Sequence, residues 1–262
     1  MGYKFELQTV QVSVIKGLVE ALKEIITETN AELSPTGLRI VATDPSVTIL
    51  IHMFLEAEKF EKYVCNETIV IGINIINLFK LTKTMGNSDS LTLYIDEEKP
   101  SQLGIRIENE EYNKVTDYKL NLIDIDEDMI SAPGTDFTTM ITMPSNEFQK
   151  ICREAYNIAD IIEIKSMGEQ LILSCNGEFA SQETTYAHTD TGVSFTKNVE
   201  DNDEDTIIQG YYLLRHLALF SKCSGLCQSI KLFLANENPL IIEYSVGSLG
   251  SLLLALAPQV ED

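Results

Sequence analysis

The sequence predicts an α+β fold built from two similar halves. Four segments carry apolar residues at helical spacing, two in each half of the 262 residues, and short runs rich in Val, Ile, Leu and Thr lie between them. Both halves follow the same order, a β run, a helix, further β runs, a second helix and more β runs, which indicates a structural duplication. We place the domains at 1–120 and 136–262, joined by a connector at 121–135.

The two predicted helices of the first half are defined by an apolar face and by a helix-end signal. Residues 13–26 place Val14, Ile15, Leu18, Leu22 and Ile25 on one face. The next helix begins near Asn74 and ends before Gly86, since glycine commonly follows a helix C-terminus.

The second half carries the other two helices. One follows Pro144, and Ser145 is its expected N-cap, with Glu147 in the first turn. The other covers 211–222 and ends before Gly225. The predicted strands lie at 37–43, 47–55, 68–73, 91–95 and 103–109 in the first half, and at 137–143, 161–165, 170–175, 206–210, 229–235 and 240–246 in the second.

The connector contains Asp124, Asp126 and Asp128 in alternation, as a calcium-binding loop does. Such a loop also needs glycine at its sixth position and an acidic ligand at its twelfth, and Met129 and Thr135 stand there. We therefore expect an acidic, solvated connector and no calcium site.

The five cysteines are scattered, without CxxC spacing or clustered histidines, so we expect reduced thiols in an intracellular protein and no metal site. No apolar run is long enough to span a membrane, and the N-terminus lacks the apolar core of a secretion signal. The search for catalytic motifs finds no phosphate-binding loop, no zinc-protease motif and no nucleophile elbow, so we expect neither an enzyme nor a bound cofactor.

Charge placement carries the functional prediction. The chain has 40 acidic and 19 Lys and Arg residues, a formal charge of −21, and such a surface repels phosphate on average. Each predicted helix nevertheless carries two basic residues three or seven apart, which places both on one face. Any single pair is typical of a solvated helix, but one pair on every helix predicts a localised basic surface that contacts a phosphate backbone without reading sequence. The basic residues are Lys16, Lys23, Lys80, Lys83, Lys150, Arg153, Arg215 and Lys222.

Along nearly its whole length the chain resembles the proliferating cell nuclear antigen family, the eukaryotic DNA sliding clamps. The stretches that carry the resemblance stand in order along the chain and end in an A-P-x-V-E tail. They are LVEALKEII, LSPTGLRIVATDPS, KLTKTMGNSDSLTL, KVTDYKLNLIDID, MPSNEFQKICREAYNIAD and NPLIIEYSVGSLGSLLLALAP.

The resemblance implies two domains of antiparallel sheets with two helices each, and a head-to-tail homotrimeric ring around duplex DNA. Helices would line the hole, and all eight basic residues match the family's hole-lining positions. Strands near 113–121 and 179–186 would pair between subunits, with Tyr118 and Phe179 in contact. The ring would tether DNA polymerase and other replication and repair proteins, need a clamp loader, and act in the nucleus or at a viral replication site in the cytoplasm.

The resemblance also implies a surface for client peptides. Its residues would be Val47, Thr48, Leu50, Ile130, Ala132, Pro239, Ala255, Ala257 and Pro258. Leu254 and Ala255 stand where the family commonly has a bulky tyrosine, and Ala132 replaces a larger aliphatic residue. A divergent, virus-encoded member fits these differences.

Other functions remain open on the residues alone. An acidic protein that mimics DNA and occupies basic partners would explain the net charge but leaves the basic helix pairs without a purpose. A monomeric or hetero-oligomeric processivity factor of the same fold is a further alternative, and a hydrolase has no recognisable nucleophile.

Overall fold

Helix α1 shows how the sequence pattern becomes packing. In a computed structural model, which describes residues 2–44, 46–126, 137–197 and 207–259, α1 spans Val12–Ile25. Ile15, Leu18 and Leu22 are buried on one face, whereas Glu20 stays exposed. This burial confirms the predicted amphipathic helix.

Helix α2 (Ile75–Thr82) begins where the sequence indicates. The side chain of Asn74 accepts a hydrogen bond from the amide of Asn77 at 2.9 Å, so it satisfies an amide that has no partner within the helix.

Helix α3 (Ser145–Tyr156) begins differently from the prediction, because Pro144 is the N-cap and Ser145 makes no cap. The hydroxyl of Ser145 is buried and lies within hydrogen-bond distance of the carbonyl oxygens of Ser224, Cys227 and Gln228. Ser145 therefore ties the start of α3 to the segment 224–228.

The predicted helix 211–222 is wrong at both ends. Residues 211–213 end strand β15 (Ile207–Leu213), where Tyr211 and Tyr212 pair with Glu163 and Ile162. Helix α4 covers only Leu214–Phe220, and a 3-10 helix, η2, follows at Ser221–Leu226. Tertiary pairing overrides the local helical pattern here.

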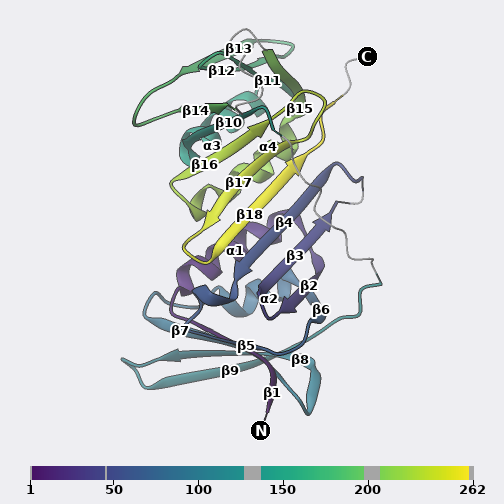
Figure 1. Cartoon of the computed structure of the whole chain (residues 1–262), viewed down its shortest axis with the longest axis vertical. Helices are drawn as coiled ribbons and strands as arrows, with labels where there is room; N and C mark the ends of the chain where they lie inside the picture. Colours follow the sequence, from purple (N-terminus) through teal and green to yellow (C-terminus); the bar gives the residue numbers. More distant parts are fainter. Residues whose placement is uncertain (1, 45, 127–136, 198–206, 260–262) are drawn as a thin grey trace. The chain divides into compact units, whose positions relative to one another are not determined.

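Residues 2–42, 52–126 and 245–252 form an N-terminal unit. It contains α1, α2 and a five-stranded sheet of order β5-β1-β7-β8-β9 (Figure 1). Its other strands follow the order β4-β3-β2-β6. The bounds are β1 Tyr3–Thr9, β2 Glu28–Ser34, β3 Gly37–Thr43, β4 Ile49–Glu56, η1 Ala57–Lys59, β5 Lys62–Cys65, β6 Ile69–Asn74, β7 Asp89–Asp96, β8 Lys99–Asn109 and β9 Lys114–Asn121.

Residues 43–44, 46–51, 137–197, 207–244 and 253–259 form a C-terminal unit. It holds α3, α4 and a four-stranded sheet of order β13-β12-β11-β15. Its further strands follow the order β14-β10-β16-β17-β18. The bounds are β10 Thr139–Pro144, β11 Ile161–Met167, β12 Gln170–Asn176, β13 Ser181–Ala187, β14 Ser194–Lys197, β16 Ser229–Leu234, β17 Leu240–Val246 and β18 Gly250–Leu256.

Within each unit the strands whose register is described pair antiparallel, as the resemblance implies. One face of the five-stranded sheet is buried, and it carries Phe5, Leu91 and Ile105. In the C-terminal unit, Ile164 and Leu173 bury the matching face of the four-stranded sheet. Two α+β units with antiparallel sheets and two α-helices each confirm the predicted fold class for the described residues.

The first connector residues are held on strands β6 and β2. The amide of Ile123 donates to the carbonyl of Gly72 at 3.0 Å, and Asn30 donates to the carbonyl of Ile125 at 3.2 Å. Asp124 and Asp126 are exposed, which agrees with a solvated acidic segment, and residues 127–135 lie outside the described part. None of the described helices is long and apolar enough to cross a membrane.

Candidate functional site

Helices α1 and α2 carry the basic residues of the N-terminal unit. Lys16 and Lys23 project from α1, Lys80 projects from α2, and Lys83 is the residue at its C-terminal end. Lys80 and Lys83 are exposed, and Lys80 donates a hydrogen bond to Asn77 at 3.2 Å.

The two lysines of α1 are half-buried and tie α1 to its surroundings. Lys16 donates to the carbonyl of Met85 at 3.3 Å, in the segment that follows α2. Lys23 pairs with Glu24 and lies 4.7 Å from the ring centre of Phe79 on α2. Both ammonium groups therefore also hold the two helices together.

The C-terminal unit presents a second basic group. Lys150 and Arg153 are exposed on α3, and Arg215 is exposed on α4. Lys222 lies in η2 and not in α4, so the predicted spacing of Arg215 and Lys222 along one helix is wrong. Because η2 and α4 both pack against α3, the four residues still belong to one helical layer of this unit.

His216 beside Arg215 adds no positive charge near neutral pH. Burial and the charge of Arg215 lower the pKa of His216, although Asp44 acts in the opposite direction. The Nε–H of Arg215 donates to Nε2 of His216 at 3.3 Å. The positive charge of this surface thus comes from Lys and Arg alone.

A tight turn stands at the start of the predicted peptide surface. The carboxylate of Asp44 accepts hydrogen bonds from the amides of Thr48 at 2.7 Å, Ile49 at 2.6 Å and Ser46 at 3.3 Å. Burial alone would raise the pKa of Asp44, but these bonds and one from the Ser46 hydroxyl outweigh burial and lower it. Sequence reasoning missed the role of Asp44 in this turn, although Asp-Pro-Ser is typical of a side chain that caps its own loop.

The turn presents Val47 to solvent in a strained conformation. Its backbone φ is 55°, a left-handed conformation that a β-branched residue rarely adopts, and the residue is 73% exposed. The carbonyl of Thr48 accepts from the amide of Ala257 at 2.9 Å, so the loop and the C-terminal tail lie side by side.

The other predicted peptide-surface residues fall into three groups. Three are half-buried: Leu50 on β4, Ala255 on β18 and Pro258 in the tail after β18. Pro239 is exposed in the turn between β16 and β17. Ile130 and Ala132 lie outside the described residues.

The predicted subunit contacts fall on two sheet edges. Among the described strands, β9 is last in its sheet and β13 is last in the four-stranded sheet, so each exposes one row of backbone groups. Tyr118 lies on β9, half-buried on the face that carries Ile105. Phe179 is 77% exposed in the turn before β13.

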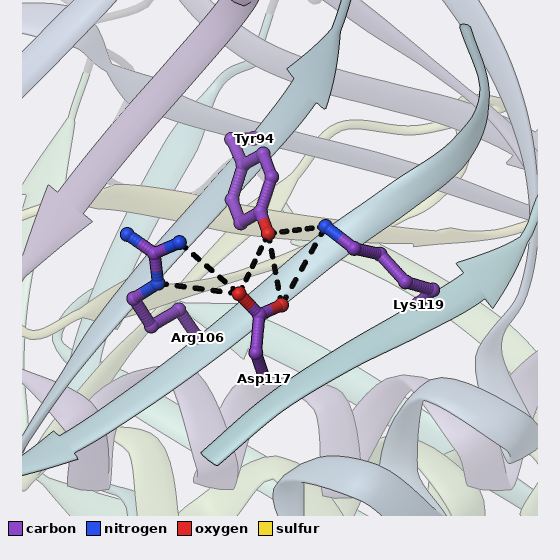
Figure 2. Close-up of polar contacts among 4 residues, drawn as sticks. All are labelled: Tyr94, Arg106, Asp117 and Lys119. Carbon is purple, nitrogen blue, oxygen red and sulfur yellow. Dashed lines mark hydrogen bonds and ion pairs between the residues drawn. The ribbon is translucent and has the colours of Figure 1, made fainter. Parts of the chain in front are cut away.

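The opposite face of β9 carries a polar cluster, which we call the Asp117 cluster: Tyr94, Arg106, Asp117 and Lys119 (Figure 2). The Tyr94 hydroxyl lies 2.8 Å from both carboxylate oxygens of Asp117, and Arg106 Nη2 lies 3.1 Å from Oδ2. Lys119 donates to the Tyr94 hydroxyl, with its Nζ 4.0 Å from the ring centre. Sequence reasoning missed the cluster.

Gly104 makes the Asp117 cluster possible. A Cβ at Gly104 would lie 2.3 Å from Cζ of Tyr94, so the ring reaches from β7 across β8 to β9 only because this residue has no side chain. An isolated glycine inside a strand pattern often marks such a close approach, and it is the signal that could have revealed the cluster.

The described residues contain no group of three or more His, Cys, Asp or Glu arranged to hold a metal ion. The five cysteines are free thiols. Burial raises the pKa of the Cys152 and Cys223 thiols, so these two side chains are unreactive packing groups near neutral pH.

Comparison with known proteins covers both halves. The family model described as proliferating cell nuclear antigen, N-terminal domain, matches residues 4–130, and the corresponding C-terminal domain model matches residues 131–259. A relative named "Probable DNA polymerase sliding clamp 1", from Paramecium bursaria Chlorella virus 1, is 35% identical over 97% of this chain and 96% of its own. "Proliferating cell nuclear antigen" from Chaetomium thermophilum is 32% identical over 98% of each chain. The chain therefore belongs to the proliferating cell nuclear antigen family.

Proposed function

We propose that this chain is a non-catalytic processivity factor, a sliding clamp that closes as a homotrimer around duplex DNA and tethers DNA polymerase to it. The observation that carries the proposal is the match of both family models, end to end, over residues 4–259. Two further features support it. Exposed basic residues lie on the helices of an acidic chain, and β9 and β13 each have an edge with no neighbour among the described strands, which a head-to-tail ring would cover.

In the proposed ring the eight basic residues face DNA. Three copies carry a formal charge of −63, three times −21, so the basic residues must be segregated from the acidic ones for the ring to accept DNA. Lys and Arg contact phosphates without reading bases, and such contacts are weak and salt-sensitive, as a sliding protein requires.

The proposed client surface is the exposed loop at Val47 with the tail at Ala257 beside it. Client proteins would insert short peptides with apolar anchors there, and Val47 would contact them directly. The strain at Val47 gives a test, because asparagine tolerates the left-handed conformation but offers no apolar contact. Val47→Asn should bind a peptide from the polymerase several-fold more weakly without a loss in the free energy of unfolding. Unchanged affinity would remove Val47 from the surface.

The proposed partners are double-stranded DNA, a DNA polymerase with other replication and repair proteins, and a clamp loader. The names of the two relatives support a site of action at replicating DNA, in a nucleus or in a virus-infected cell.

Topological retention on DNA tests the proposal directly. A linear duplex is fixed to a bead at one end, the protein is added so that rings thread over the free end, and that end is then blocked. After a wash at about 0.5 M salt, which screens ionic contacts, a clamp should remain on the bead and leave when the duplex is cut. Loss of the protein in the wash despite the block, or retention that survives cutting, would contradict encirclement. An acidic DNA mimic would not be retained at all.

A further inference from the structure

The Asp117 cluster leaves one positive charge in excess at the β9 edge. Among the residues that the structure describes, Arg106 and Lys119 both pair with one carboxylate, that of Asp117, on the exposed face of the sheet. Burial would raise the pKa of Asp117, but hydrogen bonds from Tyr94 and Arg106 outweigh it and hold that pKa below its ordinary value. Asp117 is therefore ionised near neutral pH and neutralises one of the two cations.

Lys119 has capacity for a further partner. An ammonium group has three donors, and here one is given to the Tyr94 hydroxyl while Asp117 Oδ1 lies at 3.6 Å. The Lys119 side chain is 42% exposed on the last described strand of its sheet. It can thus donate a hydrogen bond to a carboxylate on a strand added at that edge.

The β13 edge carries the complementary excess. On its exposed face Glu163 accepts from the Ser174 hydroxyl at 2.9 Å and pairs with Lys165 at 3.4 Å, so its charge is compensated. Glu183 of β13 lies opposite Ser174 on the same face. Glu183 is exposed, and no ion pair to it is found within the described ranges.

The alternation of the two strands places Lys119 and Glu183 on one face of any sheet that joins them. Tyr118 and Leu120 share the buried face of β9, and Gln182 and Thr184 lie on the face of β13 that carries Cys175 and Leu173. A shift of the pairing register by one residue would place apolar residues of one strand beside charged residues of the other. The exposed face of β9 must therefore continue into the exposed face of β13. An antiparallel pairing over the full length of both strands puts Glu183 opposite Lys119 or within two residues of it.

We propose that Glu183 of one copy forms an ion pair with Lys119 of the next, and that the Asp117 cluster holds Lys119 in place for it. The inference rests on the ring proposed above and names an electrostatic determinant of its closure. Because each copy offers one positive and one negative edge, the pairing favours head-to-tail joining of β9 to β13 over joining of two like edges.

A double-mutant cycle tests the pair. The ring's dissociation is followed by mass photometry on dilution for the wild type, Lys119→Gln, Glu183→Gln and the double variant, at about 50 and 500 mM salt. Each single change should raise the dissociation constant of an interface about twofold to fivefold at low salt, and the double variant should add little to either. The effects should shrink at high salt.

Charge reversal gives the sharper arm. Glu183→Lys should weaken association more than Glu183→Gln, because it faces Lys119 with a like charge. The matched control is Glu169→Lys, which makes the same charge change at an exposed turn of the same sheet. Glu183→Lys that associates as tightly as Glu169→Lys, or single effects that simply multiply in the double variant, would overturn the pair while leaving the ring intact. A wild type that stays monomeric at every concentration would overturn the ring as well.

Discussion

Asp117 concentrates several interactions on one carboxylate near the edge of a sheet. Its side chain is 32% exposed and contacts Tyr94, Arg106 and Lys119. Because these contacts connect β7, β8 and β9, their loss would loosen the edge strand before the rest of the unit. Asp117 therefore contributes to the free energy of unfolding, and this contribution depends on pH through the ionisation of its carboxylate.

Asp117→Asn should lower the free energy of unfolding at pH 7 by about 1–2 kcal/mol. The substitution weakens the charge-assisted hydrogen bonds, and it leaves the buried Tyr94 hydroxyl with an amide oxygen, which is a weaker acceptor than a carboxylate. The folded-state pKa of Asp117 lies below the ordinary value of 3.8, so its contribution is complete above about pH 4 and is lost as the pH falls through the lower folded value. Urea unfolding from pH 7 to pH 3 should show the difference between wild type and variant shrinking only at the acid end. Glu111→Gln, in an exposed turn of the same sheet, is the control.

Gly72 allows the connector to approach strand β6. A Cβ at this position would lie 2.2 Å from the carbonyl oxygen of Ile123, which is a backbone atom. Gly72→Ala should therefore cost about 1–3 kcal/mol of unfolding free energy and raise amide exchange at Ile123, whose N–H bonds to Gly72. Gly86→Ala is the control, because its nearest neighbour would be 3.7 Å away. Equal effects of the two changes would show that the approach is not tight in solution.

At the scale of elements, helices with a clear apolar stripe were predictable from sequence, and α1 differs from its predicted range by one residue. Strand β2 was missed because its buried residues include Thr29 beside Ala31 and Leu33, so its apolar alternation is weak. Strand β13 has no apolar alternation, so only the family resemblance indicated a strand there. The end of β15 read as helix, since Tyr211 to Leu213 continue the spacing of α4 and only pairing with β11 identifies them as strand.

The candidate sites also differ in whether a local sequence pattern could predict them. Basic helix residues were found from spacing alone, because helical periodicity determines which side chains share a face. The loop at Val47 and the two sheet edges came only from the family resemblance. The Asp117 cluster depends on strand register, which brings Tyr94, Arg106 and Lys119 together from three strands, and no local pattern encodes that.

Helix α2 offers the cleanest test of the proposed DNA-facing surface, since Lys80 and Lys83 are both exposed. Lys80→Glu with Lys83→Glu should weaken binding to a short linear duplex and reduce the salt slope of the binding constant by about 1 for each lysine that contacts phosphate. Fluorescence anisotropy over a salt series measures this. Circular dichroism should show the fold intact.

The matched control for the helix test is Lys59→Glu with Lys99→Glu. It makes the same charge change at two exposed lysines that belong to none of the four α-helices, Lys59 in η1 and Lys99 on β8. If both double variants lose affinity equally, net charge and not placement governs binding, and the DNA-facing role of α2 is wrong.

At the scale of the whole molecule, the proposed function depends on closure. An acidic chain with one basic surface per unit would bind DNA weakly as a monomer, and a ring makes weak contacts sufficient because DNA cannot leave sideways. The exposed edges of β9 and β13 and the exposed Phe179 are then the surfaces that assembly covers.

The mass of the protein in solution tests this claim most directly. Sedimentation equilibrium at micromolar concentration should give about 88 kDa, three times the chain mass of 29.3 kDa. Tyr118→Ala, on the β9 edge, should shift the distribution toward the single chain. A wild-type mass of 29.3 kDa across the micromolar range would contradict the ring.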